Sequence, residues 1–324
     1  MRLGVYFDLR NPPEWRQDWS RLYSFALELC EESERLSADS AWFSEHHLFE
    51  DGYLPQPLTF AAAAAARTSR IRIGTAVLIA PLRRAIQLAE EAAVVDILSD
   101  GRLDLGLGAG YRQPEFDAYG AKLDDRYHAT DQIVLDLRKT WEDGAVTPPP
   151  QQSPVPIWLG YGGPRGARRA GRLGTGLLSL NAGLLAPYRQ GLREAGLDPA
   201  AARMSGPVHA WVTEDPERDW PLVARHHAYQ WDSYRRYMVE GTGRPAPRPI
   251  DPERSRAKGL APGMGNLLYA TPEEAASQIR EHVRGLPVDT VFFWVSLAGM
   301  PEDAVLRHVR TLCTRLRPLL NDEP

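Results

Sequence analysis

Residues 41–47 read Ala41-Trp42-Phe43-Ser44-Glu45-His46-His47, a short apolar run that ends in one carboxylate and two imidazoles. A run of this length bounded by polar residues predicts a buried strand. In α/β proteins, the side chains that carry chemistry lie at the carboxyl ends of strands. Glu45, His46 and His47 are therefore candidates for proton transfer or metal binding. The alternative is that they are loop residues with a structural role.

The composition is that of an ordinary globular protein. The chain has 324 residues, a formal net charge of −4, 43% hydrophobic residues and 25% charged residues. This length fits one large barrel-type domain or two smaller domains. The weakly acidic balance gives no reason to expect a nucleic acid or an anionic membrane as a partner. Cys30 and Cys313 form no CxxC spacing, and no signal peptide or membrane span is recognised, so a cytoplasmic location is expected.

Eight apolar segments, each followed by a helical pattern, are expected to be strands. They cover residues 3–7, 41–44, 71–79, 103–108, 155–159, 176–180, 206–212 and 290–295. Eight strand–helix units in a chain of this length predict an α/β fold of the (β/α)8 TIM-barrel type, in a single domain over residues 1–324. A doubly wound sheet is the alternative, but no GxGxxG motif opens the first helix. Residues 240–264, rich in Gly, Pro and Arg, are expected to form an irregular insertion before the eighth strand.

Other imidazole and indole side chains have simpler expected roles. His226 and His227 lie on a charged helix and are expected to be surface residues or to pack against the insertion, with a place in the substrate pocket as the alternative. Trp158 and Trp294 lie in predicted strands and are expected in the core or in a pocket wall.

Three stretches together resemble the bacterial luciferase-like superfamily of flavin monooxygenases. They are residues 42–47, residues 73–110 with the run Ser99-Asp100-Gly101-Arg102-Leu103, and residues 156–174 with Pro156-Ile157-Trp158-Leu159-Gly160. Residues 270–274 resemble a further landmark of the family. The resemblance covers most of the chain in order. It implies a TIM barrel that binds reduced FMN, or the deazaflavin F420, at the carboxyl ends of the strands.

The resemblance also implies roles for particular residues. His46 matches the active-site histidine, which would handle protons near the flavin or the substrate, and Glu45 would line the flavin site or orient a histidine. A cis peptide bond is implied between Ala76 and Val77, beneath the flavin ring. The turn Gly108-Ala109-Gly110-Tyr111 would border the same site.

The turn Gly160-Tyr161-Gly162-Gly163-Pro164-Arg165-Gly166 is expected to bind the cofactor phosphate. Backbone N–H groups at a helix N-terminus favour an anion, and glycines permit its close approach. The alternative is an ordinary strand–helix turn. Luciferase itself has an arginine where Ala109 stands, so the charged contact is expected from Arg112 or Arg165.

The resemblance implies an oxidoreductase, most simply a monooxygenase that uses reduced FMN and O2 on a small organic substrate. A separate flavin reductase and a homodimer are implied in the same way. The alternatives are F420-dependent hydride transfer, suggested by Gly163-Pro164-Arg165, a non-catalytic flavin-binding protein, and a metal-dependent hydrolase with Glu45, His46 and His47 as ligands. Barrel hydrolases usually carry HxH on their first strand, whereas this strand ends in Tyr6-Phe7-Asp8.

Overall fold

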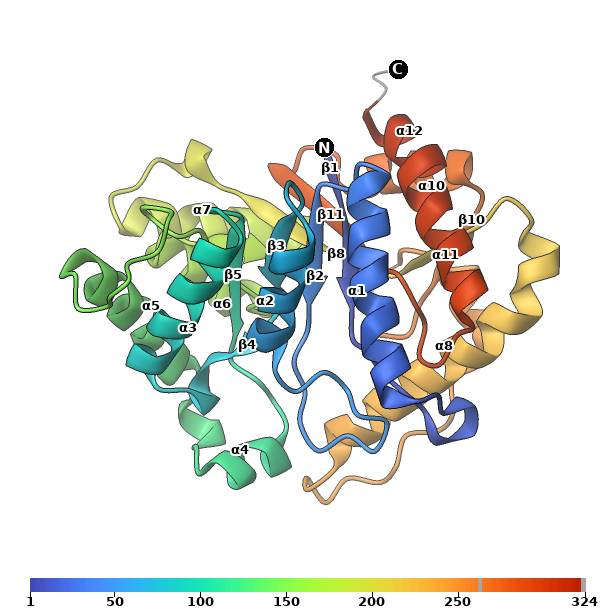
Figure 1. Cartoon of the computed structure of the whole chain (residues 1–324), viewed down its shortest axis with the longest axis horizontal. Coiled ribbons are helices and arrows are strands. Elements are labelled where there is room, and N and C mark those ends of the chain that lie inside the picture. Colours follow the sequence, from blue (N-terminus) through green and yellow to red (C-terminus); the bar gives the residue numbers. More distant parts are fainter. Residues whose placement is uncertain (262–263, 322–324) are drawn as a thin grey trace.

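The strands form one closed parallel barrel in the computed structural model, which describes residues 1–261 and 264–321 (Figure 1). The order around the barrel is β3-β2-β1-β11-β8-β7-β6-β5-β4, and β3 also pairs with β5, which closes the ring. The strands are β1 (Arg2–Phe7), β2 (Ser40–Phe43), β3 (Arg72–Thr75), β4 (Leu78–Ile79), β5 (Leu103–Gly108), β6 (Ile157–Leu159), β7 (Gly176–Leu178), β8 (Met204–Val208) and β11 (Val288–Trp294). The predicted (β/α)8 barrel is confirmed.

The helices form the outer layer. They are α1 (Trp19–Arg35), α2 (Pro57–Arg67), α3 (Ala85–Leu98), α5 (Arg126–Glu142), α6 (Gly163–Arg172), α7 (Leu185–Glu194), α8 (Pro216–Val239), α10 (Pro272–His282), α11 (Glu302–Thr311) and, after a π-helical turn (Leu312–Leu316), α12 (Arg317–Asn321). Asp18 caps α1 by accepting the N–H of Arg21, and the helix buries Phe25 and Leu29 against the barrel. Within the described residues, no helix has the length and apolarity needed to cross a bilayer.

Two predicted strands are each divided in two. The segment 71–79 forms β3 and β4, separated by a cis peptide bond between Ala76 and Val77. The segment 206–212 leaves the barrel after β8, and β9 (Ala210–Val212) pairs in parallel with β10 (Leu268–Ala270) outside it. The prediction of single strands was wrong because the apolar pattern continues across both breaks.

Two helices were missed by the sequence interpretation. The predicted irregular insertion contains α9 (Pro252–Lys258), which is capped by Asp251 and ends at Gly259, so the prediction was wrong there. Residues 262 and 263 of the insertion lie outside the described residues. A further helix, α4 (Gln113–Tyr119), follows β5 and ends at Gly120, which has a φ of +67°.

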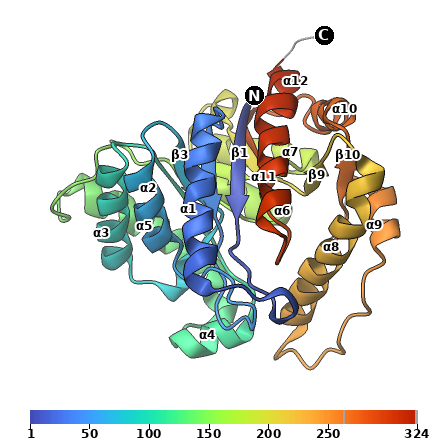
Figure 2. The ribbon, with the colours of Figure 1, turned by 45° about the vertical axis from the view of Figure 1, so that its right-hand side comes forward.

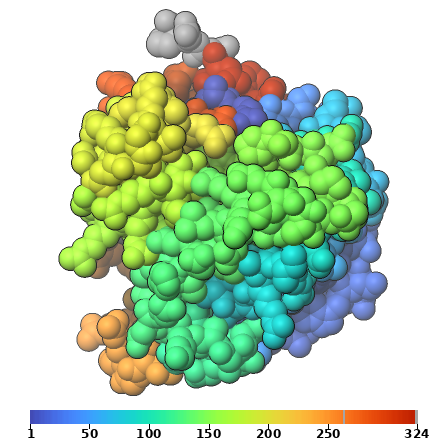
Figure 3. All heavy atoms as spheres, turned by 90° about the vertical axis from the view of Figure 1, so that its left-hand side faces the viewer, coloured from blue at the N-terminus to red at the C-terminus, as the bar shows by residue number. Residues whose placement is uncertain are grey.

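The loops, α4 and the insertion lie together at the carboxyl ends of the strands. In Figure 2 the β1 arrow points toward the end that carries α4, and both termini lie at the opposite end. Figure 3 shows the orange insertion beside the green region of α4 at the lower end of the molecule. Glu240, the first residue of the insertion, forms an ion pair with Arg112, which immediately precedes α4.

Large side chains, all but one of them aromatic, fill the inside of the barrel below this end. They are Tyr6, Trp42, Trp158, Leu178, Phe292 and Trp294, with Ala76 and Val77 packed against them. Because side chains alternate along a strand, Asp8 continues the inward row that Tyr6 begins on β1. The barrel interior is therefore filled by packed side chains, and the residues that follow the strands lie at the carboxyl end of this packed layer.

Candidate functional site

His46 lies at the centre of this end and is held by a carboxylate that the sequence interpretation did not select. Its Nδ1 is 2.9 Å from Oε1 of Glu115, which also accepts the backbone N–H of His47 at 2.9 Å. Glu115 is fully buried on α4. Because an ionised carboxylate only accepts hydrogen bonds, the proton of a neutral His46 lies on Nδ1. Nε2 is then a free acceptor, and the Tyr111 hydroxyl lies 3.3 Å from it.

His47 is also placed between a carboxylate and a tyrosine. Its Nε2 is 2.9 Å from Oε1 of Glu45, and its Nδ1 is 3.1 Å from the Tyr119 hydroxyl. Glu45 also accepts hydrogen bonds from Arg83 and from the backbone N–H of Ile79, both at 2.6 Å. Glu45 therefore contacts His47 and ties the loop after β2 to β4.

The cis peptide bond between Ala76 and Val77, expected from the sequence, is present. The Tyr6 hydroxyl donates a 2.5 Å hydrogen bond to the carbonyl of Ala76. A Cβ atom at Gly108 or Gly160 would overlap the side chain of Val77. These two glycines therefore make room for Val77, so that a half-buried surface of small residues lies at the barrel centre.

The rest of the predicted turn after β5 packs behind this surface. Ala109 is buried, and Gly110 has a φ of +68°. A Cβ atom at Gly110 would approach Ile79 and Phe116 to less than 3.0 Å. Tyr111 reaches His46 from this turn, so the turn contributes one side chain to the site and otherwise fixes the position of α4.

A ring of tyrosines surrounds His46. The rings of Tyr53, Tyr111 and Tyr234 lie 4.8, 5.4 and 5.6 Å from the imidazole. The hydroxyls of Tyr53 and Tyr234 are 2.6 Å apart, and Ser44 donates to Tyr53 at 2.8 Å. Burial raises the pKa of all three phenols, so they stay protonated at neutral pH.

A cavity of about 640 Å³ opens at the predicted phosphate turn. It is lined by Tyr127, Gly162, Gly163, Pro164, Arg165, Gly166 and Arg169. No side chain caps the N-terminus of α6, which begins at Gly163. Arg165 is exposed, and its side chain forms no hydrogen bond or ion pair within the described residues. An uncapped helix N-terminus beside a free guanidinium suits a phosphate group.

Two residues considered for the same role are turned elsewhere. The Tyr161 ring is buried away from this cavity, and its hydroxyl donates to Asp131 at 2.7 Å. Arg112 is 2% exposed, donates to the carbonyl of His47 at 2.6 Å and pairs with Glu240. Of the two arginines expected to make the charged contact, only Arg165 lines this cavity.

The histidines do not converge on a common metal position. His46 and His47 contact different carboxylates, Glu115 and Glu45. Within residues 1–261 and 264–321, no group of three or more His, Cys, Asp or Glu side chains could hold a metal ion.

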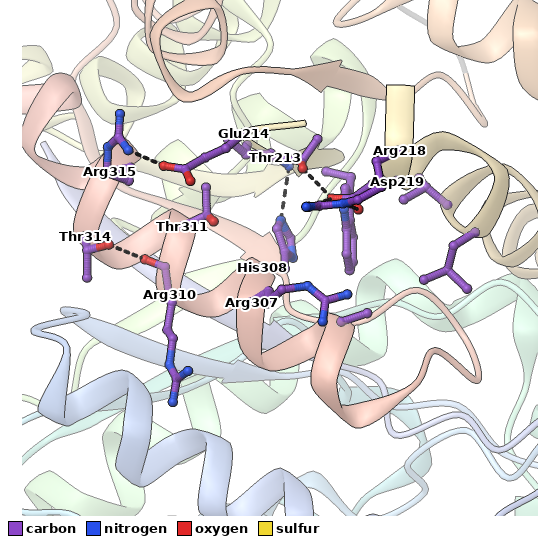
Figure 4. A pocket seen from close by; sticks show the side chains of 15 residues that line it. Thr213, Glu214, Arg218, Asp219, Arg307, His308, Arg310, Thr311, Thr314 and Arg315 are labelled. Carbon is purple, nitrogen blue, oxygen red and sulfur yellow. Dashed lines mark hydrogen bonds and ion pairs between the residues drawn. The ribbon is translucent and has the colours of Figure 1, made fainter. Parts of the chain in front are cut away.

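A further pocket, of about 270 Å³, lies between the β9–α8 connection and α11 (Figure 4). Four of its charged side chains pair with one another, Arg315 with Glu214 and Arg218 with Asp219. Burial lowers the pKa of His308 in its wall to about 4. None of the site residues predicted from the sequence lines this pocket.

Comparison with known proteins identifies the family. The family model for luciferase-like monooxygenases matches residues 1–290. The chain belongs to this family. Enzymes of the family are oxidoreductases that use FMN or F420, as the names of related proteins indicate.

Relatives of both kinds are similar to this chain. The F420-dependent glucose-6-phosphate dehydrogenase of Amycolatopsis mediterranei is 26% identical over 79% of this chain and 84% of its own length. The oxygenase component of the flavin-dependent trigonelline monooxygenase of Acinetobacter baylyi is 33% identical, but over only 36% of this chain and 32% of its own length. The crystal structure of the monooxygenase RslO1 from Streptomyces bottropensis has the same fold, with a TM-score of 0.78, 24% identity and coverage of 98% of this chain and 99% of that chain.

Proposed function

We propose that this protein is the oxygenase of an FMN-dependent monooxygenase, which uses reduced FMN and O2 to oxidise a small organic substrate. The observation that supports this most is the pairing of His46 with Glu115 at the strand ends that also carry the cis Ala76–Val77 bond. An imidazole oriented by a carboxylate is suited to proton transfer near neutral pH. The surface of small residues next to it leaves room for a flat ring.

The residues at this end fit such a cofactor. Gly162, Gly163 and Arg165 would hold the phosphate through backbone N–H groups and one guanidinium. Ala76 and Val77 would lie against the ring. When bound, reduced FMN would supply the electrons that activate O2.

His46 would accept and return a proton through Nε2. Glu115 keeps the other ring nitrogen protonated, and the Tyr111 hydroxyl lies within reach of Nε2. Phe49 stacks on the imidazole at 4.8 Å, and Tyr53 lies edge-on to it at the same distance. These rings exclude water from the imidazole, which strengthens its polar contacts.

A separate flavin reductase would deliver reduced FMN. This part of the proposal rests on the Acinetobacter baylyi relative, which is named as an oxygenase component. We also propose that residues 1–324 form a single domain, that the protein is a cytoplasmic homodimer, and that Glu45 acts on the site through His47. Light scattering after size-exclusion chromatography would determine the number of subunits.

F420-dependent hydride transfer is the second candidate. It is favoured by the Amycolatopsis mediterranei relative, because the alignment covers 84% of that protein. The same cavity beside Gly163 and Arg165 would then receive the F420 phosphate.

Titration with reduced FMN, oxidised FMN and F420, followed by absorption and fluorescence, tests the proposal. We expect saturable binding of reduced FMN. Gly162→Asp would place a carboxylate where a Cβ meets no atom within 4 Å, at the uncapped start of α6. This variant should weaken FMN binding by about ten-fold or more without lowering Tm, whereas Gly162→Ala should not. Binding of F420 alone would favour the second candidate, and binding of neither would overturn both.

A further inference from the structure

Several polar side-chain atoms at the carboxyl end of the barrel are buried without a hydrogen-bond partner. They are Asp8 Oδ2, Asp51 Oδ1, Glu115 Oε2, His226 Nε2, His227 Nδ1, Gln230 Nε2 and Trp294 Nε1. Folded proteins contain few such atoms, because each one costs about 1–3 kcal/mol. Their concentration at the end of the barrel that also carries His46 suits a surface that a ligand completes.

Asp8 is the most telling of these groups. It follows β1, is 3% exposed, and has one carboxylate oxygen without a partner. The nearest guanidinium, Arg10, is already engaged by Asp51 at 2.8 and 2.6 Å. Burial raises the pKa of Asp8 to about 6, and the charge of Arg10 only partly offsets this effect. Asp8 is thus mostly ionised at neutral pH and lacks a counterion of its own.

The charges buried around Asp8 do not balance. Two buried carboxylates, those of Asp8 and Asp51, face one buried guanidinium, that of Arg10. The other buried carboxylates at this end, Glu115 and Glu45, have their own partners in His46 and His47. Two aspartates therefore share one counterion, and a ligand with a positive charge would neutralise the difference.

The neighbouring histidines cannot supply that positive charge. The ring of His209, after β8, lies 5.2 Å from the ring of Trp294 and 5.2 Å from that of His227. Burial lowers the pKa of His209 to about 4 and that of His227 to about 3. Both imidazoles are therefore neutral at physiological pH and act as aromatic wall.

These rings continue toward the catalytic histidine. The centre of the Trp231 ring lies 5.0 Å from that of His209 and 5.6 Å from that of Tyr234. The centre of the Tyr234 ring lies 5.6 Å from that of His46. A row of aromatic rings thus joins the Trp294 side of the barrel end to the His46 side. Aromatic faces together with one carboxylate are the features that recognise organic cations.

We propose that the substrate carries a cationic nitrogen, which Asp8 binds between the aromatic faces of Trp294, His209 and Trp231. The inference rests on the proposed function, since the bound cation is the substrate of that enzyme. Asp8 is the anchor, and the part of the substrate that reacts extends toward His46.

Calorimetric titration with four ligands that share one phenyl ring tests this inference. They are benzylammonium, benzyltrimethylammonium, benzyl alcohol and benzoate, each titrated into the full-length protein with and without FMN. We expect both cations to bind at least about ten-fold more tightly than benzyl alcohol, and benzoate to bind most weakly. This preference is measured on the wild-type protein and needs no variant.

Asp8→Asn and Asp104→Asn are a matched pair of variants. Asp104 is also a buried carboxylate next to an indole, that of Trp158, but it lies at the amino end of β5. Asp8→Asn should reduce the cation preference to about two-fold or less, and Asp104→Asn should keep it. Neither variant should change the affinity for FMN.

The outcomes separate the inference from the proposed function. Equal binding of cations and benzyl alcohol by the wild type, or an unchanged preference in Asp8→Asn, would overturn the inference. FMN binding without a cation preference would overturn the inference but would support the proposed function. A cation preference that depends on Asp8, without binding of either cofactor, would overturn the proposed function and retain the cation site.

Discussion

Asp104 and Asp8 are both buried aspartates next to a tryptophan indole, but they lie at opposite ends of the barrel. Asp104, at the amino end, accepts hydrogen bonds from Trp158 Nε1 at 3.1 Å and from Arg72 Nε at 2.6 Å. Asp8, at the carboxyl end, keeps one oxygen without a partner. The hydrogen bonds of the aspartate are complete at the amino end and incomplete at the carboxyl end. In TIM barrels the carboxyl end is the one that usually binds ligands.

Other residues extend this contrast. Arg102, which immediately precedes β5, donates to the carbonyls of Ile71 and Ala65, to Thr68 and to Ser99. At the other end, Oε1 of Glu115 contacts both His46 Nδ1 and the backbone N–H of His47, whereas Oε2 has no hydrogen-bond partner. The proposed site and the contacts of Arg102 therefore lie at opposite ends of the barrel axis, which makes the effects of substitutions at the two ends distinguishable.

The largest effect is expected at the carboxyl end, for His46→Ala. Loss of a proton-transfer group should lower kcat by about 10²–10⁴-fold, while Tm changes little. Steady-state kinetics with the identified substrate and thermal unfolding check this. His47→Ala is the control, since the His47 ring is held between Glu45 and Tyr119. This variant should lower Tm and change kcat little. Unchanged turnover in His46→Ala would remove the proposed role.

At the amino end, Arg102→Ala should lower the free energy of unfolding by about 3–5 kcal/mol. The substitution leaves several backbone carbonyls without a donor in a region that water reaches poorly. Urea denaturation measures the loss, and FMN titration of the folded variant should give the wild-type Kd. Weaker FMN binding would contradict the separation of the two ends.

Asp8→Asn should stabilise the protein at high pH. The pKa of Asp8 is about 6 when folded and 3.8 in its reference state, so the protonated form is favoured by folding. Its stabilising contribution is present below about pH 4 and is lost as the pH rises through 6. A pKa difference of about two between the folded and unfolded states corresponds to about 3 kcal/mol of unfolding free energy. The variant should therefore be up to that amount more stable than wild type at pH 8, and little more stable at pH 4. Urea denaturation at both pH values checks this, and Asp104→Asn should be less stable than wild type at pH 8.

The smallest effect is expected for Arg165→Ala. Removal of one exposed guanidinium from the phosphate cavity should weaken FMN binding by about three- to ten-fold. Riboflavin, which lacks the phosphate, should bind equally well to wild type and variant. An equal loss for both ligands would show that Arg165 does not contact the phosphate.

Much of the fold could be predicted from the sequence, because each strand–helix unit is marked by a local pattern. His46 was selected by its position after a buried strand, whereas its partner Glu115 lies 69 residues away on a helix that was not predicted. The signals for α4 and α9 were nevertheless present, as a proline in the first turn and a glycine after the last.

Contacts between distant segments explain the rest of what the sequence did not predict. His226 and His227 were expected at the surface or against the insertion. They are buried, where His226 bonds to the carbonyl of Ala298 and His227 to that of Gly265. Local charge on their helix gave no indication of which face the barrel would cover.

The double engagement of Arg112 limits how this enzyme can be redesigned. One buried guanidinium holds the His47 carbonyl and also the carboxylate of Glu240, where the insertion begins. The insertion is the obvious segment to exchange between relatives in order to alter substrate range. A transplanted segment without an acid at position 240 would leave the buried guanidinium of Arg112 with only the longer, 3.9 Å ion pair to Glu115, which also holds His46. Successful chimaeras should therefore take residues 112 and 240 from the same parent protein.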